Sequence, residues 1–186
     1  YFKEVYAMQL KIETPRLVLR AFEIEDASDL LAYLSQPRGN CFIGEKILNI
    51  EQAVEKIKSR QQSKDYLAVQ LKQTNQVIGE LFFIHEEPDT YSVGWNFNAN
   101  FHGQGFAYES TYAFLDHLFN QLNARRIYAY VEEDNDASQK LCERLGMRKE
   151  GCFVEYISFV QHEDGTPKYE NTLQYAILKK EWLDKK

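Results

Sequence analysis

Two glycines, Gly103 and Gly105, stand where a strand pattern gives way to a helix pattern. Glycine has no side chain to keep a ligand away from the backbone. The first turn of a helix carries N–H groups without internal partners and a partial positive charge of about half a unit, so it accommodates a phosphate well. We therefore predict a cradle for a pyrophosphate at this join, formed by His102, Gly103, Gln104, Gly105, Phe106 and Ala107.

Three interpretations of the glycine pair compete. A dinucleotide-binding fold would place a third glycine three residues after Gly105, where this sequence has Tyr108. A phosphate-loop nucleotidase would close the loop with Gly-Lys-Ser or Gly-Lys-Thr, which is absent from the sequence. The third interpretation is a strand-to-helix turn that binds no ligand, and the two glycines alone leave it open.

The residues around the glycines resemble a known family. The string NFHGQGFAYES is similar to the acyl-CoA-binding motif of the GNAT N-acetyltransferases, which has Arg or Gln, two residues, Gly, one residue, and Gly or Ala. Gly103 and Gly105 match this motif, whereas Asn100 departs from its first position. Other strings resemble the RimJ/RimL-like branch in the same order: TPRLVLRAF, QVIGELFF, YSVGWNF, NDASQKLCERLGMRKEG and QYAILKKEW. The resemblance extends from Ile12 to Trp182, and its specificity comes from the ordered set.

This resemblance implies an α/β GNAT fold: a mixed, mostly antiparallel sheet of about seven strands, with a central parallel pair splayed apart and helices on both faces. It also implies an enzyme that moves an acetyl group from acetyl-CoA directly to a primary amine in a ternary complex. The acceptor would be a protein N-terminus or a small amine. The free strand edge at Phe97 and Asn98 would pair with the pantetheine arm, and a backbone amide beside a bulge there would polarise the thioester carbonyl.

The departing thiolate of such a reaction needs a proton or a hydrogen-bond donor. Asn135 and Ser138 match the Asn-x-x-Ser motif that precedes a tyrosine in many GNAT enzymes, and the place of that tyrosine holds Cys142. In the RimL-like branch the serine is the proposed donor, so the resemblance points to Ser138, with Asn135 as a cofactor-binding residue. A local helix cap is the alternative for Ser138. Cys142 either packs in the core or shares the role, because a free thiol has a pKa of about 8.5.

The incoming ammonium must lose a proton before it can attack. Glu80 lies on a predicted strand beside the cleft. Glu155 lies near the place of a glutamate in the RimL-like branch, two residues offset but on the same face of a strand. Both are candidates for the general base, and a solvated strand glutamate is the alternative for each. Glu109 is predicted to interact with the helix dipole, and since His102 and His117 lack ligand spacing we predict no metal site.

Apolar periodicity predicts the elements that position these residues. Strands are expected at 16–22, 66–71, 76–85, 91–98, 126–131, 153–160 and 172–178, and helices at 26–34, from 49 or 50 onward, 104–122 and 136–146. The order strand, helix, strand, helix, strand in the second half implies one parallel pair in an otherwise antiparallel sheet. Two neighbouring strands that part would leave a cleft between them.

The composition is that of a globular chain of one domain. Its 186 residues are 44% hydrophobic and 14% aromatic, and we treat 1–11 as a tag remnant or flexible extension of the single domain 1–186. A net charge of -6 argues against nucleic-acid binding, and no apolar run suits a membrane span. Three cysteines without metal spacing favour free thiols in the cytoplasm. We expect a monomer or a homodimer.

Two other classes of function stay open. A module that binds acyl-CoA without turnover would keep the cradle but release no thiol. A purely structural or interaction protein would bind no CoA at all.

Overall fold

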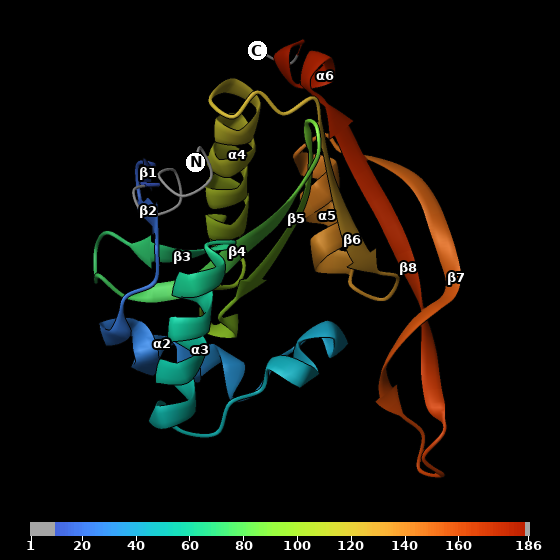
Figure 1. Cartoon of the computed structure of the whole chain (residues 1–186). Helices are drawn as coiled ribbons and strands as arrows, with labels where there is room; N and C mark the ends of the chain where they lie inside the picture. Colours follow the sequence, from blue (N-terminus) through green and yellow to red (C-terminus); the bar gives the residue numbers. More distant parts are fainter. Residues whose placement is uncertain (1–9, 185–186) are drawn as a thin grey trace.

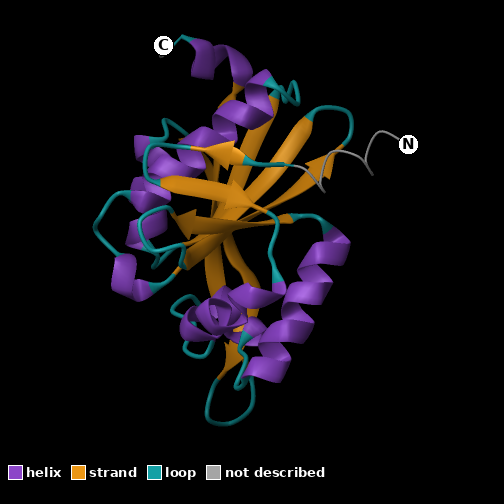
Figure 2. Cartoon of the chain, turned by 90° about the vertical axis from the view of Figure 1, so that its left-hand side faces the viewer, coloured by secondary structure: helices purple, strands orange, loops and turns teal. Residues whose placement is uncertain are grey.

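The computed structural model describes residues 10–184, which form one mixed sheet with helices on both faces (Figure 1) (Figure 2). The strands are β1 (Ile12–Glu13), β2 (Leu17–Arg20), β3 (Tyr66–Leu71), β4 (Val77–Glu86), β5 (Thr90–Phe97), β6 (Arg126–Glu132), β7 (Arg148–Gln161) and β8 (Pro167–Leu178). The α-helices are α2 (Ala27–Leu34), α3 (Ile50–Ser63), α4 (Phe106–Asn120), α5 (Asp136–Arg144) and α6 (Lys179–Leu183). Short 3-10 helices are η1 (Ile24–Asp26), η2 (Asn40–Glu45) and η3 (Ala99–Phe101).

The sheet contains one parallel pair. Its spatial order is β1-β2-β3-β4-β5-β6-β8-β7, and every neighbouring pair is antiparallel except β5 and β6. The parallel pairing joins only Thr90, Tyr91 and Ser92 to the start of β6. Beyond Ser92 the described part of β5 has no pairing with β6, and the two strands separate (Figure 1). The predicted splayed parallel pair is therefore confirmed.

Two hydrophobic clusters hold this sheet between its helices. On one face, Tyr91 and Val93 of β5 share a buried cluster with Phe114 and Leu118 of α4. On the other face, α2 and α3 pack against Ala68 of β3. Full burial of a large apolar side chain contributes about 1.5–3 kcal/mol, so both clusters fix the strands firmly. The site residues on β4 and β5 thus lie on strands that are fixed by core packing.

The structure differs from the sequence expectations in three details. The two-residue strand β1 adds an eighth strand to the expected seven. The last hairpin is longer than expected, since β7 and β8 leave a loop of only 162–166. The described β4–β5 ladder keeps one register from Gly79↔Phe97 to Glu86↔Thr90, so the expected bulge near Phe97 is wrong. The extension 1–11 lies outside the described residues, apart from its last two.

Candidate active site

The two glycines of the predicted cradle adopt backbone conformations that favour glycine. Gly103 and Gly105 have φ values of 77° and 82°, in the left-handed region, and α4 begins directly after Gly105. A Cβ atom on Gly103 would meet no atom within 4 Å. Glu109 is the first residue of the helix whose N–H reaches an internal acceptor, the Gly105 carbonyl at 3.0 Å. The earlier N–H groups of the first turn are therefore left for a ligand.

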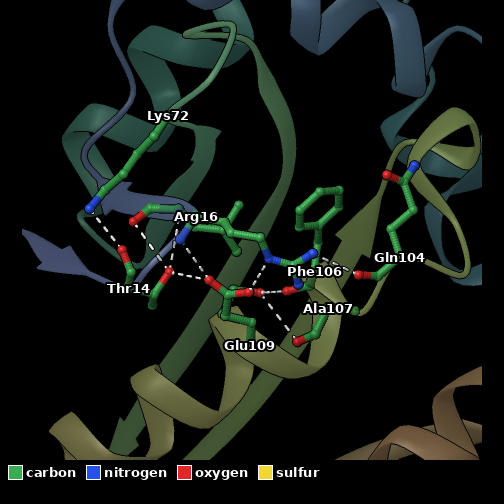
Figure 3. A network of polar contacts seen from close by, with 9 residues as sticks. Thr14, Arg16, Lys72, Gln104, Phe106, Ala107 and Glu109 are labelled. Atoms are coloured by element: carbon green, nitrogen blue, oxygen red, sulfur yellow. Dashed lines mark hydrogen bonds and ion pairs between the residues drawn. The ribbon is translucent and has the colours of Figure 1, made fainter.

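Glu109 fastens the N-terminal segment to the start of α4 (Figure 3). Its carboxylate accepts hydrogen bonds from the Thr14 hydroxyl at 2.6 Å, the Arg16 backbone N–H at 3.0 Å and the Arg16 Nε at 2.6 Å. Burial raises the pKa of Glu109, but these bonds prevail and lower it. Arg16 also donates to the Gln104 carbonyl at 3.0 Å, and its guanidinium lies 4.4 Å from the centre of the Phe106 ring. This network places the Arg16 guanidinium, paired with the Glu109 carboxylate, beside Gly105.

A cleft of about 510 Å³, here called the helix cleft, is lined by the end of β5 and the starts of α4 and α5. All predicted cofactor-binding residues except Gln104 line it: Phe97, Asn98, His102, Gly103, Gly105, Phe106, Ala107, Asn135 and Ser138. Three basic residues, Arg38, Lys140 and Arg144, also line it, against the single carboxylate of Asp136. An open backbone, a helix N-terminus and an excess of positive charge fit a diphosphate.

The end of β5 offers one backbone amide to the gap between the parted strands. The Asn98 N–H donates to the Ile78 carbonyl at 2.9 Å and is therefore engaged within the sheet. Because hydrogen-bonding directions alternate along a strand, the N–H of the preceding residue, Phe97, points away from β4 and toward the gap. Of the two amides considered in the sequence, only that of Phe97 is placed to meet a ligand there.

Ser138 lies near the start of α5 and is held from two sides. Its N–H donates to the Asn135 side chain at 3.0 Å, so Asn135 caps α5. Its Oγ accepts a hydrogen bond from Nε1 of Trp95, on β5, at 3.1 Å. Ser138 is thus a member of the helix cap and also the point where α5 contacts the parted strand.

A second cavity, of about 340 Å³, shares Ser138 and Trp95 with the helix cleft, and we call it the aromatic cavity. Its wall includes the rings of Phe42, Tyr66, Phe82, Trp95, Tyr130 and Phe159, together with Glu45, Glu80, Glu132 and Arg60. Glu80 is 1% exposed, and Nη2 of Arg60 lies 3.0 Å from Oε1 and 2.9 Å from Oε2 of its carboxylate. Burial raises the pKa of Glu80 to about 7, although Arg60 acts to lower it.

Comparison with known proteins identifies the family. Residues 16–148 match the model of the acetyltransferase (GNAT) domain, which is more than half of the chain. The chain belongs to the GNAT acetyltransferases. It is also 30% identical to the uncharacterized N-acetyltransferase YnaD of Bacillus subtilis over 178 residues, which cover 93% of this chain and 99% of that protein. It is therefore an N-acetyltransferase of the RimJ/RimL-like branch, and membership implies an acyl-CoA donor.

Solved structures agree with this assignment. A GNAT-family acetyltransferase from Bacillus anthracis superposes with a TM-score of 0.82 at 28% identity, covering 92% of this chain and all of that one. A ribosomal-protein-S5-alanine acetyltransferase from Vibrio fischeri has the same fold, with a TM-score of 0.71 at 19% identity over 94% of this chain and 99% of its own.

Some residues of this GNAT site were missed by sequence reasoning. Lys140 and Arg144 are four residues apart on α5 and so share a helix face, a spacing that the sequence displays. The Arg144 guanidinium lies 4.5 Å from the centre of the Tyr108 ring on α4. Arg38 comes from the irregular segment after α2, and the Trp95–Ser138 bond joins residues 43 positions apart. Local sequence patterns predict neither the position of Arg38 in the cleft nor the Trp95–Ser138 bond.

Two residues predicted as possible participants, Glu155 and Cys142, line neither cavity. Glu155 is exposed and lines neither cavity; its φ of 49° falls within a register shift of β7, so face parity along a regular strand does not apply. Its N–H donates to the Asn171 side chain at 2.8 Å. Cys142 is fully buried, and burial raises the pKa of its thiol to about 12, which fits core packing.

No group of three or more His, Cys, Asp or Glu side chains within residues 10–184 is placed to hold a metal ion. No helix in that range is both long and apolar enough to cross a membrane.

Proposed function

We propose that this GNAT enzyme transfers an acetyl group from acetyl-CoA directly to a primary amine, on a protein N-terminus or a small amine, with both substrates bound at once. The observation that supports this proposal is a shared wall, since four residues line both the helix cleft and the aromatic cavity: Phe42, Trp95, Asn135 and Ser138. A donor in one and an acceptor in the other would meet at this wall. Direct transfer then needs no acyl group on the protein.

The helix cleft suits the donor. Its open glycines and helix N-terminus would take the pyrophosphate, and Arg38, Lys140 and Arg144 would add charge-assisted contacts. The free edge of β5 would pair with the amide groups of the pantetheine arm. The Phe97 N–H would then polarise the thioester carbonyl as negative charge develops on its oxygen.

The aromatic cavity suits the acceptor. An ammonium group is attracted to aromatic faces and to carboxylates, and this wall supplies both. Glu80 is our candidate for the base, acting directly or through a water molecule. A base whose pKa lies near the working pH transfers protons efficiently, and the pKa of Glu80 is about 7.

Ser138 stands between the two cavities, where the departing sulfur would be. Its hydroxyl would donate a hydrogen bond to the thiolate as the carbon–sulfur bond breaks. A thiol with a pKa of about 8.5 needs only moderate stabilisation as an anion. Cys142 takes no part, because its thiol is buried in the core.

The test is release of free CoA thiol from acetyl-CoA in the presence of an amine panel. The panel contains peptides with free N-termini and polyamines, because the name of the structurally similar Vibrio fischeri enzyme points to a protein acceptor, while the cavity itself suits any cation. We expect amine-dependent release and an acetylated product by mass spectrometry. Cofactor binding without release for any amine would favour a non-catalytic module instead. Binding is measured by thermal shift, since ligand at a hundred times its Kd adds about 2.7 kcal/mol of stability.

A further inference from the structure

The Ser138 hydroxyl is oriented by its neighbour on the parted strand. Trp95 Nε1 and Ser138 Oγ lie 3.1 Å apart. An indole N–H can only donate, so the serine oxygen is the acceptor in this bond. A hydroxyl has one hydrogen and two lone pairs, and Trp95 occupies a lone pair. The hydroxyl hydrogen must therefore point away from the indole, and within residues 10–184 no protein acceptor is recorded for it.

Both partners are held by regular structure. Trp95 sits on β5 opposite Leu81 of β4 and packs against the cluster under α4. Ser138 is fixed at its backbone by the Asn135 cap at 3.0 Å. The direction of the hydroxyl is thus set jointly by α5 and by β5, whose free edge faces the gap.

We propose that Trp95 is a positioning residue for acetyl transfer, which turns the Ser138 hydroxyl hydrogen toward the helix cleft. This inference rests on the proposed function and adds a residue that acts through Ser138. When the carbon–sulfur bond breaks, its electron pair goes to sulfur, and the Ser138 O–H donates to that sulfur. The Trp95 N–H bond polarises the hydroxyl and strengthens this donation. The proton lost by the amine goes to the base, and the one that sulfur finally gains comes from solvent.

The test begins with Trp95→Phe, which keeps a ring in the wall and removes the N–H. We expect kcat to fall about tenfold, the size of one such hydrogen bond in a transition state, with KM for acetyl-CoA within about twofold. Ser138→Ala should lower kcat at least as much. In the Ser138→Ala background, Trp95→Phe should cause no further loss, because the group it orients is gone.

The chain offers a matched control. Trp182 is its other tryptophan, and its Nε1 donates to Asp116 at 3.0 Å, away from both cavities. Trp182→Phe removes an equivalent bond and should leave kcat unchanged. It also leaves Trp95 as the single indole. In that protein, Ser138→Ala should shift the remaining indole N–H resonance in the NMR spectrum and speed its exchange with solvent, a measurement that does not require Trp95→Phe to fold.

Three outcomes would overturn the proposal: an unchanged kcat in Trp95→Phe, an equal loss from Trp95→Phe with and without Ser138, or an indole resonance indifferent to Ser138→Ala. Failure of the proposed function would give a different set of results from failure of the Trp95 proposal. In that case the unmodified protein would acetylate no amine in the panel, and the indole measurement would still report whether Trp95 holds Ser138 in solution.

Discussion

The helix cleft and the aromatic cavity share a wall but are built in different ways. The cleft is made largely by one continuous stretch that runs from β5 through η3 into α4, and its main contribution is backbone. The aromatic cavity takes its wall from η2, α3, β3, β4, β5, β6, α5, β7 and β8, and its contribution is side chains. A backbone cradle recognises a group common to all acyl-CoA donors, whereas a wall of separate side chains can be changed one residue at a time. Under the proposed function, donor binding in the cleft and acceptor choice in the cavity could therefore change independently.

Charge divides the two regions as well. Among the lining residues, the cleft has three basic side chains and Asp136, while the cavity has three glutamates and Arg60. Under the proposed function, an anionic donor would be attracted to the cleft and a cationic acceptor to the cavity. The shared wall between them carries the uncharged groups of Trp95 and Ser138.

The largest effect is expected from Gly105→Glu. The new carboxylate would stand among N–H groups that favour an anion, so CoA affinity should fall more than about 100-fold, or roughly 3 kcal/mol. Isothermal titration with CoA measures this. Gly165→Glu is the matched control, because Gly165 has the same φ of 82° in the β7–β8 turn and a Cβ there meets nothing within 4 Å. Equal losses of CoA affinity in both variants would contradict the prediction that Gly105 belongs to a phosphate-binding cradle.

Glu80→Gln should affect the other region. We expect kcat/KM to fall roughly 100- to 1,000-fold, as for loss of a general base, with CoA affinity nearly intact. In the unmodified enzyme, activity should rise with pH through about 7 as Glu80 loses its proton, and the variant should lack this rise. Glu155→Gln is the control and should keep both rate and pH profile. A pH profile shared by Glu80→Gln and the unmodified enzyme would exclude Glu80.

The Glu80 carboxyl should also make the stability of the protein depend on pH. Its pKa is about 7 in the folded protein, above the ordinary 4.5, so between these values the folded state keeps a proton that the unfolded chain has lost. The free energy of unfolding should therefore decrease as pH rises from about 4.5 to about 7. Urea unfolding at pH 5 and pH 8 should show a larger difference for the unmodified protein than for Glu80→Gln. An equal difference would mean that Glu80 titrates normally.

The contrast between the regions also explains what could be predicted from the sequence. Gly103, Gly105 and the helix after them are neighbours in the chain, so local patterns and a family motif located the cleft. The partners of Glu80 and Ser138 are distant: Arg60 is 20 residues from Glu80, and Trp95 is 43 from Ser138. Glu155 was predicted from an alternation rule that assumes a regular strand, whereas β7 shifts register there and Glu155 lines neither cavity. Backbone features formed by neighbours in the chain were predictable, and side-chain arrangements across separate elements were not.

A smaller effect is expected from Arg144→Ala. Removing one positive charge from the cleft, and its contact with the Tyr108 ring, should raise KM for acetyl-CoA about three- to tenfold with kcat unchanged. Added salt should reduce the difference in KM between the variant and the unmodified enzyme, because salt screens the attraction between the Arg144 charge and the donor. Lys149→Ala, on exposed β7, is the control. A change in kcat instead of KM would place Arg144 in the chemistry and not in donor binding.

The smallest effect on turnover is expected from Cys142→Ala, although the residue occupies the place of a catalytic tyrosine in related enzymes. Its thiol is fully buried, lines neither cavity and has a pKa raised by burial to about 12, so we expect it to stay protonated and take no part. We expect kcat within about twofold of the unmodified enzyme and a loss of roughly 1 kcal/mol in unfolding free energy from the vacated core volume. Steady-state kinetics measures the effect on kcat, and urea unfolding measures the effect on stability. A large drop in kcat at unchanged stability would instead make the thiol part of the shared wall, and the cleft and cavity would then meet at a chemically active cysteine.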